Sequence, residues 1–159
     1  IAVNSDGSVQ QSTSIAAAGG LLRNHLGKCV GAFLANLGTY TITRAEMVGA
    51  ITGLEMAWTS GYRKVSLRLD STTAITILIA RDNRSNICYN LTRRFRELMQ
   101  RNWEVKISHS YRECNKAADY LANKAQSFTL GTHYFGISYS GLNFLILYDR
   151  MGIAQNHFI

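Results

Sequence analysis

The stretch AEMVGAITGLEMAW, residues 45–58, decides how this chain folds. Its large apolar residues recur at spacings of three and four, which predicts a helix. A second face of the same helix carries small residues, which allow it to lie very close to a neighbouring surface. Gly49 and Gly53 each cost a helix about 1 kcal/mol relative to alanine, so close packing is a sensible reason for them. The small-residue face also carries Glu46.

Strand patterns lie on both sides of this helix. Three short apolar segments precede it, joined by turns, and they predict an antiparallel meander within residues 1–37. Alternating apolar and polar side chains predict two later strands, at residues 64–69 and 103–108. Three more helices are predicted, at residues 74–80, 91–101 and 113–126. This order is typical of an α/β domain with a mixed sheet.

The domain is expected to cover residues 1–127. From residue 128 onward the sequence is richer in Gly, Tyr, Phe and Leu and has weak periodicity, with one or two helical turns predicted at residues 142–148. We interpret residues 128–159 as a tail that packs either on the domain or on a partner. Because the chain begins without Met, we expect it to be a piece of a longer polypeptide.

Composition limits the class of protein. The chain has 159 residues, 47% of them hydrophobic, which suffices for one domain with a core of its own. Its net charge of +7 favours an anionic partner such as nucleic acid, although a solubilising surface charge explains it equally well. The three cysteines show no C-x-x-C spacing, which favours a reducing, intracellular compartment without separating nucleus from cytoplasm. No apolar run reaches about 18 residues, so we expect no membrane partner.

Four of the ten carboxylates occupy unusual positions. Asp6 interrupts the first strand, where aspartate has poor β-propensity, and Glu46 lies on the small-residue face. Asp70 ends the strand at 64–69, and Asp119 interrupts an alanine-rich helix. Sites in open α/β sheets form at strand ends. If the first and fourth strands are neighbours, Asp6 and Asp70 lie side by side, with Glu46 above them.

Such a cluster would be a metal site. Clustered carboxylates repel one another and take up protons unless a cation lies among them. Oxygen ligands select hard cations, so we expect Mg²⁺ or Mn²⁺, and a basic protein suits two-metal phosphoryl chemistry. Each acid also has a structural alternative: a turn, a helix-start acid, an N-cap or an exposed helix position, for Asp6, Glu46, Asp70 and Asp119 in turn.

Five segments stand in an order typical of one family: VNSDGS (3–8), GGLLRNHLGKCVGAF (19–33), RAEMVGAITGLEMA (44–57), VSLRLDS (65–71) and HSYRECNKAADYLANKA (109–125). With them the chain resembles the ribonuclease H type 1 family, and most closely the plant reverse-transcriptase-like ribonuclease H domains of non-LTR retroelements. The resemblance implies a ribonuclease H-like α/β fold. Its five-stranded mixed sheet has three antiparallel strands, then parallel strands, and is flanked by helices.

The resemblance also implies an activity. It predicts a metal-dependent endonuclease that hydrolyses the RNA strand of RNA/DNA hybrids with two Mg²⁺ ions, for which Mn²⁺ can substitute. The implied metal ligands, which are also the catalytic acids, are Asp6, Glu46, Asp70 and Asp119. His109 is the implied catalytic histidine. The implied partners are the hybrid and an upstream reverse transcriptase domain.

Substrate contacts are implied at Gly7, Ser8, Asn115 and Arg112. Further phosphate contacts would come from the basic helix at 91–101, for which a solvated face is an equal explanation, or from other cations, namely Arg23, Lys28, Arg112 and Lys116. Two alternatives stay open. One is a catalytically weak or inactive nucleic-acid-binding module derived from a retroelement, and the other is an inactive domain that docks through its aromatic tail.

Overall fold

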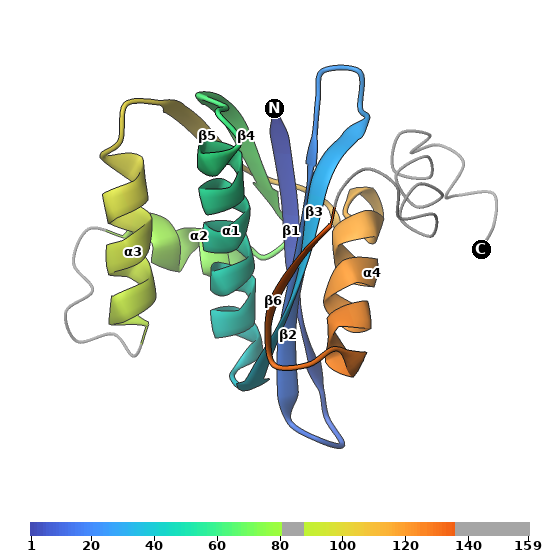
Figure 1. Ribbon diagram of the computed structural model, residues 1–159. Coiled ribbons are helices and arrows are strands. Elements are labelled where there is room, and N and C mark those ends of the chain that lie inside the picture. The colour runs from blue at the N-terminus through green and yellow to red at the C-terminus, as the bar shows by residue number, and fades with distance from the viewer. Residues whose placement is uncertain (81–87, 136–159) are drawn as a thin grey trace.

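The computed structural model describes residues 1–80 and 88–135. Six strands form one sheet in the order β5-β4-β1-β2-β3-β6 (Figure 1). The strands are β1 (Ala2–Gln10), β2 (Ile15–Arg23), β3 (Cys29–Thr39), β4 (Lys64–Leu69), β5 (Glu104–His109) and β6 (Gly131–Phe135). The helices are α1 (Ile42–Thr59), α2 (Thr72–Ile79), α3 (Tyr89–Met99) and α4 (Lys116–Lys124), with short 3-10 turns η1 (Arg112–Cys114) and η2 (Ala125–Ser127).

The predicted mixed sheet is confirmed, but it has six strands where five were predicted. β1, β2 and β3 run antiparallel, and β4 and β5 run parallel to β1, so the first and fourth strands are neighbours as expected. The additional strand is β6, which pairs antiparallel with the edge of β3. Its five residues are mostly exposed and carry no clear alternation, so its pairing with β3 defines it. The helical turns predicted at 142–148 lie outside the described residues.

Helices cover the two faces of the sheet unequally. On one face α1 packs over β1 and β2, with α2 and α3 beside it (Figure 1). This layer buries a large apolar cluster around Val3, Met47, Ile51 and Leu67. On the other face α4 packs on β1, β2 and β3, over a smaller cluster that includes Leu121. Within the described residues, no helix is long and apolar enough to cross a membrane.

The close packing predicted for the small-residue helix is confirmed. A Cβ atom at Gly53 would lie 2.5 Å from Val3 Cγ1, and one at Gly49 would lie 3.1 Å from the Asp6 carbonyl oxygen. A glycine on the strand has the same effect, because a Cβ atom at Gly7 would lie 2.7 Å from the Glu46 backbone nitrogen. Glycines on both elements therefore let α1 lie directly on β1 and bring Glu46 to the strand.

Two helix boundaries differ from the prediction. The helix predicted in the stretch 45–58 begins earlier, at Ile42, and the Thr41 hydroxyl accepts from the Arg44 backbone N–H at 3.2 Å. The helix predicted at 113–126 is divided, because Asn115 has non-helical backbone angles and α4 begins after it. The buried Asn115 side chain donates to the Ser5 carbonyl oxygen at 3.0 Å, which ties the start of α4 to β1.

Candidate active site

The end of β4 places two acids next to each other. β1 pairs with β4 only as far as Ser5, which lies opposite Leu69. Asp6 follows Ser5 within β1 and stays paired with Gly19 of β2, whereas Asp70 follows Leu69 just beyond the end of β4. The two acids are therefore neighbours at the point where β4 ends. α1 adds Glu46 from above. One carboxylate oxygen from each of these three residues lies within 4.8 Å of the others, in a group that could hold a metal ion.

These carboxylates are withdrawn from water. Asp6 is 6% exposed, and burial, together with the charge of Asp70, raises its pKa to about 8. The Gly7 backbone N–H donates to Asp6 Oδ1 at 2.8 Å and opposes this shift. Burial also raises the pKa of Glu46, against a hydrogen bond from the Ser71 hydroxyl that lowers it. Buried carboxylates this close together take up a proton unless a cation lies among them. An oxygen-only set of this kind fits a hard divalent ion.

Asp119 lies in the first turn of α4, near these three acids but outside their group. Its Oδ1 accepts from Asn123 Nδ2 at 3.2 Å, and its negative charge contributes to the raised pKa of Asp6. The fourth predicted acid thus approaches the cluster from the opposite face of the sheet to α1.

His109 stands at the same edge. It is opposite Leu69 in the β4–β5 register, and its Nε2 lies 3.1 Å from the Asp70 carbonyl oxygen. Because a carbonyl only accepts, Nε2 must carry the proton in the neutral ring and Nδ1 is then an acceptor. Tyr111 packs edge-on against the imidazole at 5.3 Å between ring centroids.

A family model described as reverse transcriptase-like matches residues 4–125. The chain belongs to the reverse transcriptase-like family. This match and the relatives described next confirm the predicted resemblance to ribonuclease H. An Arabidopsis thaliana protein named as a candidate ribonuclease H is 35% identical over 155 residues, which make up 98% of this chain and 25% of that protein. This chain therefore spans about a quarter of the length of that curated relative.

Solved structures agree on the fold. RNase H1 from the halophilic archaeon Halobacterium salinarum has a TM-score of 0.71 at 30% identity, over 78% of this chain and 95% of that one. LC11-RNase H1, isolated from compost and solved in complex with an RNA/DNA hybrid, has a TM-score of 0.68 at 20% identity, over 77% and 94% of the two chains. The first shares both sequence and fold with this reverse transcriptase-like chain, and the second shares the fold.

Two predicted substrate contacts of this reverse transcriptase-like chain connect β1 to α4. The Ser8 hydroxyl donates to the Ala122 carbonyl oxygen at 2.9 Å and accepts from Gln126 Nε2 at 3.0 Å. Asn115 is fully buried, donates to Ser5 and accepts from Asn4 Nδ2 at 3.1 Å. Their contact with substrate stays a prediction, while their structural role is visible.

The other two predicted contacts border the acids. Gly7 is buried against Glu46, as its close approach to α1 requires. Arg112 is exposed, and its Nε lies 3.8 Å from Asp70 Oδ2. Its positive charge also lowers the pKa of Glu46, so the guanidinium faces the cluster.

The sequence had offered the Asp70-Ser71 pair as an N-cap, but it gave no sign of the contact between Ser71 and Glu46. The Ser71 side chain caps α2 by accepting from the Ala74 backbone N–H at 3.1 Å, and its hydroxyl also reaches Glu46. Ser71 therefore holds the N-cap position that was an alternative explanation for Asp70.

Arginines of the α3 segment are already engaged with the protein. Arg93 Nε lies 3.2 Å from Glu97 Oε1, and Arg94 Nη2 lies 3.0 Å from Glu55 Oε1. The Arg101 guanidinium lies over the Trp58 ring at 5.1 Å. These contacts favour the ordinary solvated helix face over a phosphate-binding surface.

Proposed function

We propose that this domain is a metal-dependent endonuclease that hydrolyses the RNA strand of RNA/DNA hybrids by a two-metal mechanism. One observation carries the proposal: Asp6, Glu46 and Asp70 converge within 4.8 Å, with the pKa of Asp6 raised to about 8. Such an arrangement is unfavourable without a cation and suits phosphoryl chemistry with one. Membership of a ribonuclease H-like family supports the same conclusion.

Asp6, Glu46 and Asp70 would hold the ions, with Asp119 beside them. Mg²⁺ is the expected metal, and Mn²⁺ can substitute because both prefer oxygen ligands. When bound, the divalent ions would lower the pKa of the attacking water and stabilise charge on the scissile phosphate and the leaving oxygen.

The chain's own groups prepare this chemistry. The Gly7 N–H and the Ser71 hydroxyl orient the carboxylates of Asp6 and Glu46 before substrate arrives. Arg112, exposed next to Asp70, presents a positive charge to an incoming phosphate. His109 Nδ1 is the acceptor for a proton at the edge of the site, since Nε2 donates to the Asp70 carbonyl.

The net charge of +7 suits a nucleic-acid substrate, and selection of the RNA strand would use its 2′-hydroxyls. We also propose that the domain works beside a reverse transcriptase domain. In support, the family is described as reverse transcriptase-like, and the chain spans only 25% of its Arabidopsis relative.

The test is cleavage of a labelled RNA/DNA hybrid, with RNA duplex and DNA duplex as comparison substrates. We expect cleavage of the RNA strand of the hybrid with Mg²⁺ or Mn²⁺ and none in chelator. Asp70→Asn should reduce cleavage by more than about 100-fold, because loss of even an outer-sphere partner costs 10- to 100-fold.

The matched control is Glu97→Gln, which neutralises an exposed, ion-paired carboxylate on α3 and should cleave like the parent chain. An intact hybrid at several concentrations of both metals would overturn the proposal. If the chain also bound the hybrid in a salt-sensitive way that Asp70→Asn left unchanged, the inactive binding module would be the correct interpretation.

A further inference from the structure

The half of the sheet that α4 leaves uncovered is basic. Side chains of paired residues point to the same face, so Arg68 shares a face with Asn4 and Ser108, and Ser66 shares it with Ala2 and Lys106. This is the α4 side, because Val65, Leu67 and Leu69 point into the core under α1. α4 packs on β1, β2 and β3, so the polar side chains of β4 and β5 are left open.

Cations dominate this surface, which we call the open sheet face and define by Arg23, Lys64, Ser66, Arg68, Lys106 and Ser108. Glu104 is the only acid of β4 and β5, and it faces Lys64 at 3.9 Å. Among residues 1–80 and 88–135, no carboxylate forms an ion pair with Arg68 or Lys106. Both side chains are exposed, so their charge is available to an anion.

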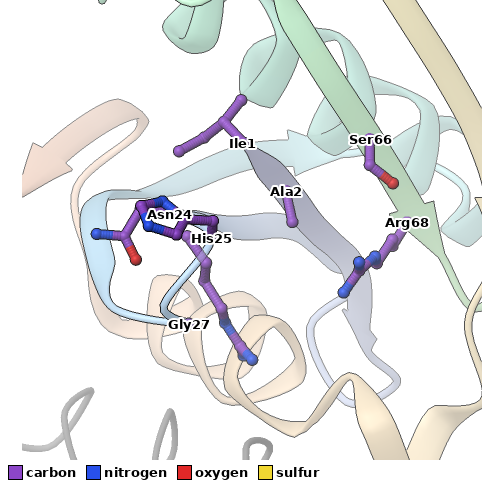
Figure 2. Close-up of a pocket in the computed structure, with 8 residues that line it drawn as sticks. Ile1, Ala2, Asn24, His25, Gly27, Ser66 and Arg68 are labelled. Atoms are coloured by element: carbon purple, nitrogen blue, oxygen red, sulfur yellow. The ribbon is translucent and has the colours of Figure 1, made fainter.

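The open sheet face is also hollowed. A cavity of about 420 Å³ is lined by Arg23, Arg68 and Ser66, together with Asn24 and His25. Figure 2 shows Ser66 and Arg68 on β4 across from Ile1 and Ala2, with Asn24 and His25 on the hairpin that follows β2. An adjoining cavity of about 320 Å³ shares Ser66 and adds Lys64 and Lys106. The first cavity is lined by two arginines, and the second has two lysines beside Glu104.

This surface leads to the candidate active site. Arg68 precedes Asp70 by two residues, which is about 7 Å along a strand. Ser108 directly precedes His109 on the neighbouring strand. A strand of nucleic acid whose phosphate lies at Asp70 could therefore continue over Arg68 and Ser66 toward Lys106.

We infer that the open sheet face binds the phosphate backbone of a single-stranded extension of the substrate. Phosphate is the ligand, because the face offers cations and donors but no exposed Phe, Tyr or Trp of β4 or β5 for base stacking. Cavities of this size hold a phosphate and its sugar, whereas a duplex is too wide for them. The inference deepens the proposed function and rests on it, since it makes the nuclease prefer hybrids with an unpaired end.

The test compares a blunt RNA/DNA hybrid with the same hybrid carrying a single-stranded extension of about ten nucleotides, within the usual range of site sizes. Fluorescence anisotropy in EDTA measures binding without cleavage. We expect the extension to tighten binding by the parent chain, and Arg68→Gln/Lys106→Gln to lose about tenfold in affinity for the extended hybrid only. The slope of log K against log salt should fall by about 1.4 in magnitude, or 0.7 for each lost single-strand phosphate contact.

Arg93→Gln/Arg94→Gln is the matched control, because it removes the same charge from exposed positions already paired with carboxylates. It should keep the gain from the extension. The inference is overturned if the extension brings no gain, if the gain survives Arg68→Gln/Lys106→Gln, or if that variant loses the blunt hybrid equally. Cleavage of the blunt hybrid with Mg²⁺, measured in parallel, reports on the proposed function separately, so its failure and the failure of this inference are distinguishable.

Discussion

Replacing Asp6 by asparagine should stabilise the metal-free protein. The Asp6 carboxyl is 6% exposed and has a pKa raised from 3.8 to about 8, with burial as the largest cause. Folding at neutral pH must therefore either protonate this group or bury its charge among other carboxylates. The substitution Asp6→Asn removes the charge and keeps a side-chain oxygen that can accept from the Gly7 N–H.

The shift sets the magnitude. In the unfolded chain the Asp6 carboxyl is ionised at pH 7, because this pH is about 3 units above its ordinary pKa. Protonating it on folding costs about 1.4 kcal/mol for each of these units. The ceiling is therefore about 4 kcal/mol, and relaxation around the buried group reduces it. We expect Asp6→Asn to raise the free energy of unfolding by about 2–4 kcal/mol, or roughly 5–15 °C in Tm for a chain of this length.

The pH dependence carries the same sign. Because the pKa of Asp6 is raised on folding, the folded protein holds more protons than the unfolded chain between about pH 4 and pH 8. The parent chain should therefore lose stability as the pH rises through this window and level off above it. Asp6→Asn should show a flatter profile. Saturating Mg²⁺ should stabilise the parent chain, because it binds the folded state, and should therefore reduce the difference in stability between Asp6→Asn and the parent chain.

The assay is urea or thermal unfolding in EDTA between pH 5 and pH 8.5, followed by far-UV circular dichroism. Glu97→Gln is the control, because an exposed ion pair contributes less than about 1 kcal/mol. The reasoning is refuted if Asp6→Asn is less stable than the parent chain at pH 8, or if the parent's stability does not change with pH.

Two other substitutions test the packing that positions the site. Gly7→Ala places a Cβ atom 2.7 Å from the Glu46 backbone nitrogen, so it should lower the free energy of unfolding by about 2–3 kcal/mol in chemical denaturation. Gly31→Ala meets only the flexible end of Met56 at 2.6 Å and should lower it less. Equal losses for the two variants would contradict the argument. Asn115→Ala leaves buried polar groups of Asn4 and Ser5 without their partner, so it should lower the free energy of unfolding by about 2–3 kcal/mol. The control Asn123→Ala changes an exposed residue and should lower it by under about 1 kcal/mol. If Asn115→Ala left the stability unchanged, these hydrogen bonds would not secure α4.

The sequence predicted those helices and strands whose form follows from the spacing of their own side chains. The spacing of large and small residues in α1 determined both its helical form and its close approach to β1, so sequence predicted both. β6 was missed because its five residues, mostly exposed, lack alternation and are ordered by pairing with the free edge of β3. The division of the last helix at Asn115 was missed because the partners of that side chain lie more than 100 residues away along the chain.

The candidate site was likewise predicted only in part from the sequence. Asp6 within the first strand and Asp70 at the end of the fourth were predicted to meet if those strands were neighbours, and the parallel pairing of β1 with β4 makes them so. The contact between Ser71 and Glu46 depends on how α1 and α2 are placed relative to each other, which periodicity does not specify. The distance of Asp119 from the other acids likewise depends on the depth at which α4 lies on the sheet. A Cβ atom at Gly19 would come 2.3 Å from the Ala122 nitrogen, so that depth depends on a single glycine.

Two unfavourable features of this chain explain each other. Glycines inside α1 weaken the helix by about 1 kcal/mol each, and buried carboxylates that repel one another weaken the fold. The glycines allow α1 to lie so close to β1 that Glu46 is held against Asp6, where it would not stay by its own electrostatics. A surface helix serving stability alone would use alanine at both positions and leave Glu46 in water. The close packing therefore makes sense as the means of holding negative charges together until a cation binds between them.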